Sequence, residues 1–168
     1  MLLFLNIFPK SWLPTFNWIE ASGLGASVRD SLWSFAVIES VHLLALAVMG
    51  GAVLIVDLRL FGFGLRRQPV RQIARDAEPW LISSLAVMLL TGFPLMASLA
   101  ASKYYVNLAF QLKMVFLLLA IIFTFTIRRN VIYREDNRIS PALGWIVGLV
   151  SLFLWSGVGF MGRGIGFY

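Results

Sequence analysis

The sequence contains no cysteine and a single histidine among its 168 residues. The lack of cysteine excludes disulfide bonds, cysteine-ligated zinc, iron–sulfur clusters and covalently attached c-type haem. The single histidine, His42, excludes a haem held by two histidines of one subunit. Few side chains therefore remain that are able to ligate a redox cofactor.

Charged residues are also scarce. They make up 13% of the chain, while hydrophobic residues make up 60%. Soluble domains are about one quarter charged and about half apolar. The apolar residues gather into four blocks of roughly 20 residues each, which is the length of a helix that crosses a bilayer. This pattern argues against a soluble enzyme and predicts an integral membrane protein.

The four blocks predict an all-α membrane protein, built as an up-down bundle of four transmembrane helices. The transmembrane domain is expected to cover residues 31–168. Its spans are predicted at about residues 32–56, 80–100, 107–127 and 142–161.

Local signals refine these helices. Ser27 or Asp30 is expected to begin the first one, and Pro79 is expected to mark the start of the second. Gly144 and Gly148 lie four residues apart in the last span, a spacing that lets two helix backbones approach closely.

Basic residues indicate how the chain is oriented. The segments 66–79 and 128–141 hold eight of the arginines, and cytoplasmic loops carry such an excess of basic residues. We therefore predict a multi-pass protein of the bacterial inner membrane, with both termini on the outer side. Because these arginines follow apolar blocks, the net charge of +6 is interpreted as a topology signal, and no nucleic-acid partner is expected.

Residues 1–30 are expected to form an amphipathic segment at the outer, periplasmic-side interface. Trp12 and Trp18 suit the depth of the lipid headgroups. Gly23 and Gly25 are expected to form a hinge into the first span.

Three ionisable residues lie inside the predicted spans: Glu39, His42 and Lys113. A charge at the centre of an inserted helix costs roughly 2.5–3.5 kcal/mol on insertion scales. Glu39 is the eighth residue of its span and Lys113 the seventh, in helices that run in the same direction. We therefore predict that the two side chains lie at one depth, within ion-pair or single-water reach.

His42 follows Glu39 by three residues, so both side chains share one helix face. Its ring is expected to face the bundle interior or a subunit interface, because an imidazole facing lipid would lose its hydrogen bonds. A b-type haem is one cofactor that His42 is able to bind, with a methionine, Lys113 or the same histidine of a second subunit as the other axial ligand. No metal ion is assigned, since zinc and iron sites need more such ligands.

Gly157, Gly159 and Gly162 match the dinucleotide-binding pattern G-x-G-x-x-G. That pattern binds a pyrophosphate where it follows a strand and opens a helix. Here it lies at the end of a predicted membrane helix, so we interpret these glycines as helix packing and a flexible exit.

One resemblance adds to this interpretation. The segment Glu39-Ser40-Val41-His42-Leu43-Leu44, followed by Asp57-Leu58-Arg59-Leu60-Phe61-Gly62, resembles a family of small bacterial four-helix inner-membrane proteins of unassigned function. The resemblance implies the same four-helix fold and brings no substrate and no catalytic residue.

The leading functional interpretation is a membrane protein that binds a ligand or cofactor through Glu39, His42 and Lys113 in the outer half of the bundle. A redox or proton-handling accessory subunit is one form of this function. Two alternatives stay open: a structural or assembly subunit whose polar residues only fix helix packing, and a channel or transporter built from several copies. The expected partners are the lipid bilayer and either further copies of the chain or a larger membrane complex.

Overall fold

The computed structural model describes residues 6–64, 67–134 and 139–167. Within these residues the chain is helical and contains no strand. By length and composition, four segments are able to cross a membrane: Trp33–Leu60, Val70–Ser98, Leu108–Ile132 and Pro141–Phe167. The predicted all-α bundle of four membrane-crossing helices is therefore confirmed.

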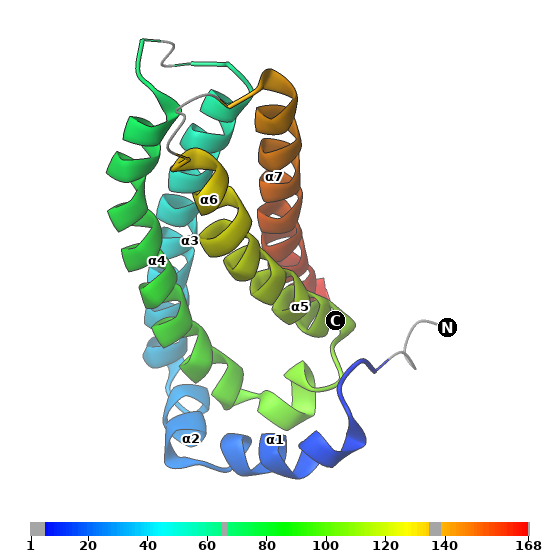
Figure 1. Cartoon of the computed structure of the whole chain (residues 1–168). Coiled ribbons are helices and arrows are strands. Elements are labelled where there is room, and N and C mark those ends of the chain that lie inside the picture. Colours follow the sequence, from blue (N-terminus) through cyan, green and yellow to red (C-terminus); the bar gives the residue numbers. More distant parts are fainter. Residues whose placement is uncertain (1–5, 65–66, 135–138, 168) are drawn as a thin grey trace.

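The elements are helices joined by short helical turns (Figure 1). Their order and bounds are η1 (Lys10–Trp12), α1 (Leu13–Glu20), α2 (Gly23–Arg29), α3 (Leu32–Leu60), α4 (Val70–Ser98), η2 (Ala100–Tyr104), α5 (Leu108–Phe123), η3 (Thr124–Arg128), α6 (Arg129–Ile132), α7 (Pro141–Gly164) and η4 (Ile165–Phe167). The turns η2 and η3 are π-helical. Helix α3 packs mainly against α4 and α7, and α5 packs mainly against α7.

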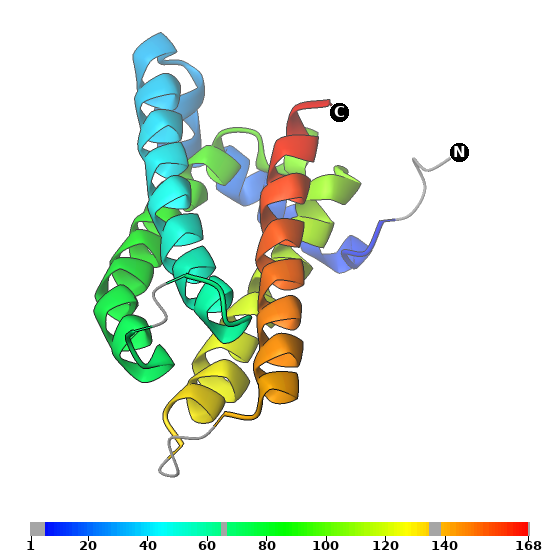
Figure 2. The ribbon, with the colours of Figure 1, turned by 90° about the horizontal axis from the view of Figure 1, so that it is seen from above.

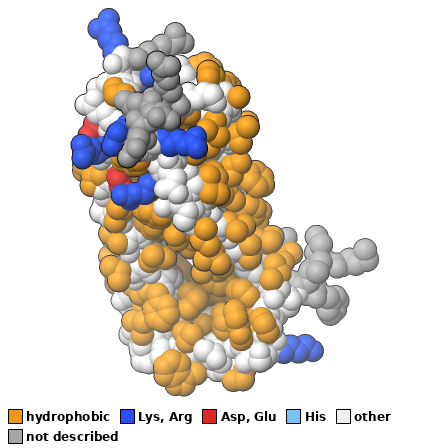
Figure 3. Space-filling view, viewed as in Figure 1, with side chains coloured by type: hydrophobic (Ala, Val, Ile, Leu, Met, Phe, Trp, Pro, Cys, Tyr) orange, Lys and Arg blue, Asp and Glu red, His pale blue; other side chains and the backbone are white. Residues whose placement is uncertain are grey.

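The two ends of the bundle differ in charge. The end of α3, the start of α4, α6 and the start of α7 lie together at one end (Figure 1). We call it the arginine end, after Arg67, Arg71, Arg75, Arg129 and Arg134, and we call the opposite end the N-terminal end. Figure 3 shows basic side chains gathered at the arginine end of the visible face and hydrophobic side chains over the flank below.

Helix α3 begins one residue after its cap, Ser31. The Ser31 hydroxyl accepts a hydrogen bond from the backbone N–H of Ser34 at 3.2 Å, which satisfies one of the free donors of the first turn. The prediction that Ser27 or Asp30 begins this helix was wrong. Both belong to the preceding short helix, since Ser27 lies inside α2 and Asp30 ends it.

Helix α4 begins at Val70, well before the predicted span. Pro79, expected at the start of the helix, lies in its interior, and Arg71 and Arg75 occupy the turns before it. Pro79 removes one backbone hydrogen bond without ending the helix. Hydropathy marks only the apolar part of such a helix, so its polar beginning was missed.

Two glycines bring α7 against the end of α3. A methyl group at Gly144 would lie 2.8 Å from the carbonyl oxygen of Leu60, and one at Gly148 would lie 2.7 Å from the ring of Phe61. The predicted close approach at these two glycines is confirmed.

The expected hinge at Gly23 and Gly25 is instead regular helix, because both residues belong to α2 and Ser22 caps it. A methyl group at Gly25 would lie 2.7 Å from the carbonyl oxygen of Ala97 on α4. Because Gly25 has no side chain, α2 is able to pack directly on α4.

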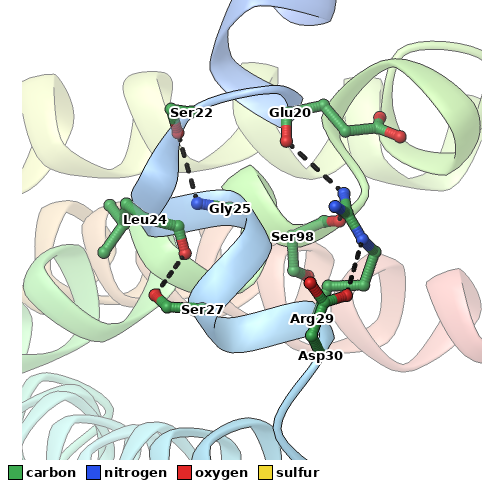
Figure 4. Close-up of polar contacts among 8 residues, drawn as sticks. All are labelled: Glu20, Ser22, Leu24, Gly25, Ser27, Arg29, Asp30 and Ser98. Atoms are coloured by element: carbon green, nitrogen blue, oxygen red, sulfur yellow. Dashed lines mark hydrogen bonds and ion pairs between the residues drawn. The ribbon is translucent and has the colours of Figure 1, made fainter.

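Hydrogen bonds tie the N-terminal segment to α4 and η2. The Arg29 guanidinium donates to the carbonyl oxygens of Glu20 and Ser98, each at 3.4 Å (Figure 4). The Glu20 carboxylate accepts hydrogen bonds from the backbone N–H groups of Ala101 at 2.6 Å and Ser102 at 2.8 Å. Desolvation alone would raise the pKa of the Glu20 carboxyl, but these two donors and the charge of Arg29 lower it below its ordinary value.

Helix α1 lies across the N-terminal end of the bundle (Figure 1). Its buried side chain, Phe16, packs edge-on against Tyr105 with ring centroids 5.3 Å apart. Trp12, just before it, and Trp18 are 49% and 74% exposed. The helix therefore has one face on the bundle and one aromatic face directed outward.

Apolar side chains from all four long helices fill the middle of the bundle. They are Ala45, Met49, Ala52, Val53, Leu81, Leu85, Met88, Ala120, Leu154, Trp155 and Val158.

Candidate ligand-binding cleft

A cleft of about 600 Å³ lies between the core and the N-terminal end, with walls from α3, α4, η2, α5 and the end of α7. Helices α3 and α7 meet at the arginine end and diverge toward the opposite end (Figure 2), and the cleft lies where they diverge. Binding sites for small molecules and cofactors have volumes of about 300–1,000 Å³. The structure brings Glu39, His42 and Lys113 to this one cleft.

His42 is held in place by α4. Its Nδ1 lies 2.8 Å from the hydroxyl oxygen of Thr91, and that hydroxyl donates its proton to the carbonyl oxygen of Val87 at 2.7 Å. The Thr91 oxygen is therefore the acceptor of the contact with His42, and the hydrogen-bond network assigns a proton to Nδ1. In the neutral ring this leaves the lone pair on Nε2.

The Nδ1 edge of the ring lies against α4. A methyl group at Gly92 would lie 3.2 Å from Cε1 and 3.7 Å from Nδ1 of His42, so glycine at this position leaves room for the imidazole. Nε2 has no hydrogen-bond partner among the described residues, and His42 lines the cleft. His42 therefore faces the bundle interior, which is one of the two orientations predicted for it.

Lys113 extends from α5 toward α7. A methyl group at Gly162 would lie 3.6 Å from its Nζ and 3.6 Å from its Cε. The predicted contact with Glu39 is not a direct ion pair, since the ion pairs of the described residues do not include it. Contact through a single water stays a prediction, since both side chains line the cleft.

Glu39 is exposed on α3 and lines the cleft as well. Its charge acts on Tyr104 of η2: partial burial raises the pKa of the Tyr104 phenol, and the nearby Glu39 carboxylate raises it further. Glu39 therefore lies near Tyr104, on the side of the cleft formed by α3 and η2.

Further side chains complete the lining. Two are cationic, Lys103 and Arg163, and two are thioethers, Met88 and Met96. The remaining large side chains are apolar and comprise Phe35, Leu43, Leu46, Leu95, Phe110, Val158 and Ile165.

Of the three glycines in the dinucleotide-like pattern, Gly157 packs against Phe116, and Gly159 and Gly162 line the cleft. The packing role predicted for these glycines is seen at Gly157, whereas the predicted flexible exit is wrong, because all three lie inside the regular helix α7.

Comparison with known proteins gives one match to a family model. Residues 15–168 match a family of unknown function, DUF6644. The chain belongs to this family. No curated protein and no solved structure matches the chain significantly. The resemblance to a family of unassigned function is thus confirmed, and the DUF6644 match covers every residue of the cleft.

A second polar contact of this DUF6644 chain escaped prediction. Arg128 of η3 donates to the Asp57 carboxylate at 2.9 Å and to the carbonyl oxygen of Val53 at 3.2 Å. Arg128 lies in the segment 128–141, which the sequence predicts as a cytoplasmic loop, and no role was predicted for Asp57. A usable signal was present: each is the first charged residue after its predicted span, in two helices that run in the same direction.

The Asp57–Arg128 ion pair is buried and has little free space around it. Oδ2 of Asp57 and the hydroxyl of Ser151 are buried without a hydrogen-bond partner among the described residues. The Thr124 hydroxyl accepts a hydrogen bond from the Trp155 indole at 3.1 Å. The cavity beside Arg128 measures only about 40 Å³, which is too small for an organic ligand. We therefore assign this cluster to helix packing.

Proposed function

We propose that the chain is an integral membrane protein that binds a small ligand or cofactor in the cleft, and that it acts as a redox or proton-handling accessory subunit. The orientation of His42 carries this proposal. Its Nδ1 is bonded to Thr91 at 2.8 Å, and its Nε2 is left for a ligand within a cleft of about 600 Å³. Proteins orient a histidine in this way when its other nitrogen binds a metal or exchanges a proton.

A b-type haem is one cofactor that this donor set supports. Haem iron already has four porphyrin nitrogens and takes one or two axial ligands from the protein. His42 offers one such ligand, and Met88, Met96 and Lys113 line the same cleft. A bare metal ion has less support, because the described residues contain no group of three or more His, Cys, Asp or Glu side chains that would hold one.

We also propose an orientation, with the arginine end in the cytoplasm of a bacterium and both termini outside its inner membrane. The positive-inside rule supports it, and it puts the cleft in the outer half of the bilayer. A reporter enzyme that works only outside the cytoplasm is expected to be active when fused after Tyr168 and inactive when inserted after Gln68. The reverse pattern would contradict this orientation.

Filling the cleft tests the proposed function. A methyl group at Gly159 meets no atom within 4 Å and Gly159 lines the cleft, so we choose Gly159→Leu to place a bulky side chain in the lining. We expect wild-type protein to carry a small molecule, seen in its absorption spectrum or by mass spectrometry of an organic extract. Gly159→Leu and His42→Ala are expected to lose this molecule and to remain folded, as judged by thermal unfolding in detergent.

Gly50→Leu is the matched control, because a methyl group at Gly50 also meets no atom within 4 Å and Gly50 lies outside the cleft. This variant is expected to keep the small molecule. If Gly159→Leu and His42→Ala have the same small-molecule content as wild type, the ligand-binding function is wrong. A loss of assembly with other membrane subunits in those variants would then favour the structural role, and a loss of ion flux through reconstituted oligomers would favour a channel.

A further inference from the structure

Lys113 carries an ammonium group within a membrane-crossing helix and forms no ion pair with a described residue. The ion pairs of the described residues are Arg29–Asp30, Arg128–Asp57 and Arg129–Glu78. Lys113 is half-buried, and its Nζ lies over Gly162 at the wall of the cleft. A cation in a membrane is normally paired, because desolvation without a partner is costly. Its position therefore favours an anion supplied from outside the chain.

The charge of the cleft as a whole favours the same partner. Lys103 and Arg163 line it together with Lys113, whereas Glu39 is the acidic residue of the lining. None of the three basic side chains takes part in an ion pair with a described residue. An excess of positive charge in a low-dielectric cleft attracts anionic groups strongly.

The mouth and the walls of the cleft are suited to a hydrocarbon chain. Leu43 of α3 lines the cleft and is exposed, so we infer that the cleft opens beside that helix. When α3 crosses a membrane, its exposed flank meets lipid. Apolar side chains of α3, α4 and α7, including Leu46, Leu95 and Val158, continue inward from the mouth.

We propose that the cleft binds a membrane lipid with an anionic phosphate headgroup. The phosphate would lie beside Lys113, with Lys103 and Arg163 near it, and an acyl chain would lie along the apolar wall. Basic pockets between membrane helices bind anionic lipid headgroups through the same chemistry. This inference rests on the proposed function, since it names the ligand class of the same cleft.

The test compares two lipids. The protein is reconstituted in phosphatidylcholine bilayers that contain a minor fraction of phosphatidylglycerol, released into neutral detergent and examined by native mass spectrometry. We expect retained phosphatidylglycerol and little phosphatidylcholine. Lys113→Gln is expected to lower the retained phosphatidylglycerol roughly tenfold or more, which is the effect of losing one hydrogen bond to a charged group.

Two further variants separate binding from folding. Lys113→Arg keeps the charge and is expected to retain phosphatidylglycerol. Lys10→Gln removes an exposed lysine outside the cleft and is expected to have no effect. Thermal unfolding of Lys113→Gln is expected to match wild type, because glutamine keeps much of the side chain and removes only the charge.

Several outcomes would overturn the inference. They are equal retention of both lipids, unchanged retention in Lys113→Gln, and binding of inorganic phosphate without any lipid. A haem or quinone that is extracted from wild type and lost from Gly159→Leu would also overturn it while leaving the proposed function intact. If Gly159→Leu changes the content of no small molecule or lipid, both proposals are wrong.

Discussion

The Arg128 guanidinium and the Asp57 carboxylate form an ion pair of 2.9 Å, although the residues are 71 positions apart in the chain. Their side chains are 6% and 0% exposed. The pair fixes the end of η3 against the last turns of α3. It thereby joins the α3–α4 pair of helices to the α5–α7 pair near the arginine end.

Arg128→Met is expected to lower the free energy of unfolding by about 3–5 kcal/mol, because it leaves the buried Asp57 carboxylate without its partner. The double variant Arg128→Met, Asp57→Leu is expected to regain most of this loss, since neither charge is then buried. Reversible denaturation in detergent micelles measures both. Wild-type stability in the single variant would contradict a buried pair.

The tautomer of His42 is directly observable, because it is the single histidine of the chain. Nitrogen NMR of ¹⁵N-histidine-labelled protein is expected to show a neutral ring protonated at Nδ1. Thr91→Val removes the acceptor and is expected to abolish this preference, with a loss of about 0.5–1.5 kcal/mol of stability. A ring protonated at Nε2 in wild type would show that Thr91 does not orient His42.

Gly23 and Gly25 lie two residues apart in α2, so the same substitution can be compared at both. Gly25→Ala is expected to lower stability by about 1–3 kcal/mol, because its methyl group would lie 2.7 Å from the carbonyl oxygen of Ala97. Gly23→Ala places its methyl group where no atom lies within 4 Å and is expected to leave stability unchanged. Thermal unfolding of both variants measures the difference, and equal melting temperatures would argue against direct packing of α2 on α4.

The contact between Glu20 and η2 is expected to depend on pH. Because the pKa of Glu20 is lowered in the folded chain, the contact is at full strength above the ordinary value of 4.5 and is lost as the pH falls through the lowered value. Hydrogen exchange of the Ala101 and Ser102 amides is therefore expected to be better protected at neutral than at acidic pH, beyond the intrinsic pH dependence. Glu20→Gln is expected to remove this additional dependence, and its persistence in that variant would assign it to another group.

The four helices were predictable because each contains a long apolar block, and the hydrocarbon layer imposes that length. The start of α4 was not predictable in this way. Arg71 and Arg75 lie on the same helix as the apolar block, but at a depth where polar side chains meet water or headgroups. Hydropathy has no means of distinguishing such a helical extension from a loop.

The depth of a charged residue in its predicted span indicates which residues lie at the same level. It does not identify which helices are neighbours. Equal depth predicted that Glu39 and Lys113 lie within ion-pair or single-water reach, and the described residues do not form the direct ion pair. The same argument applied to Asp57 would have pointed to Arg128, where η3 brings the longer side chain within reach. Thr91 was not predictable as the partner of His42, since several hydroxyl groups of α4 are equally plausible until the register of α3 and α4 is known.

The π-helical turn at Thr124–Arg128 has a consequence for variation in chain length. A π turn holds one residue more than an α-helical turn, and it absorbs this surplus locally. Deleting one residue inside η3 would restore a regular helix and keep the flanking residues on their present faces. Deleting one residue from the regular part of α5 would instead rotate the helix on one side of the gap by about 100° relative to the other, and Arg128 would turn away from Asp57 if α5 kept its place. In the segment that comprises α5, η3 and α6, insertions and deletions are thus expected to accumulate at η3 rather than in α5.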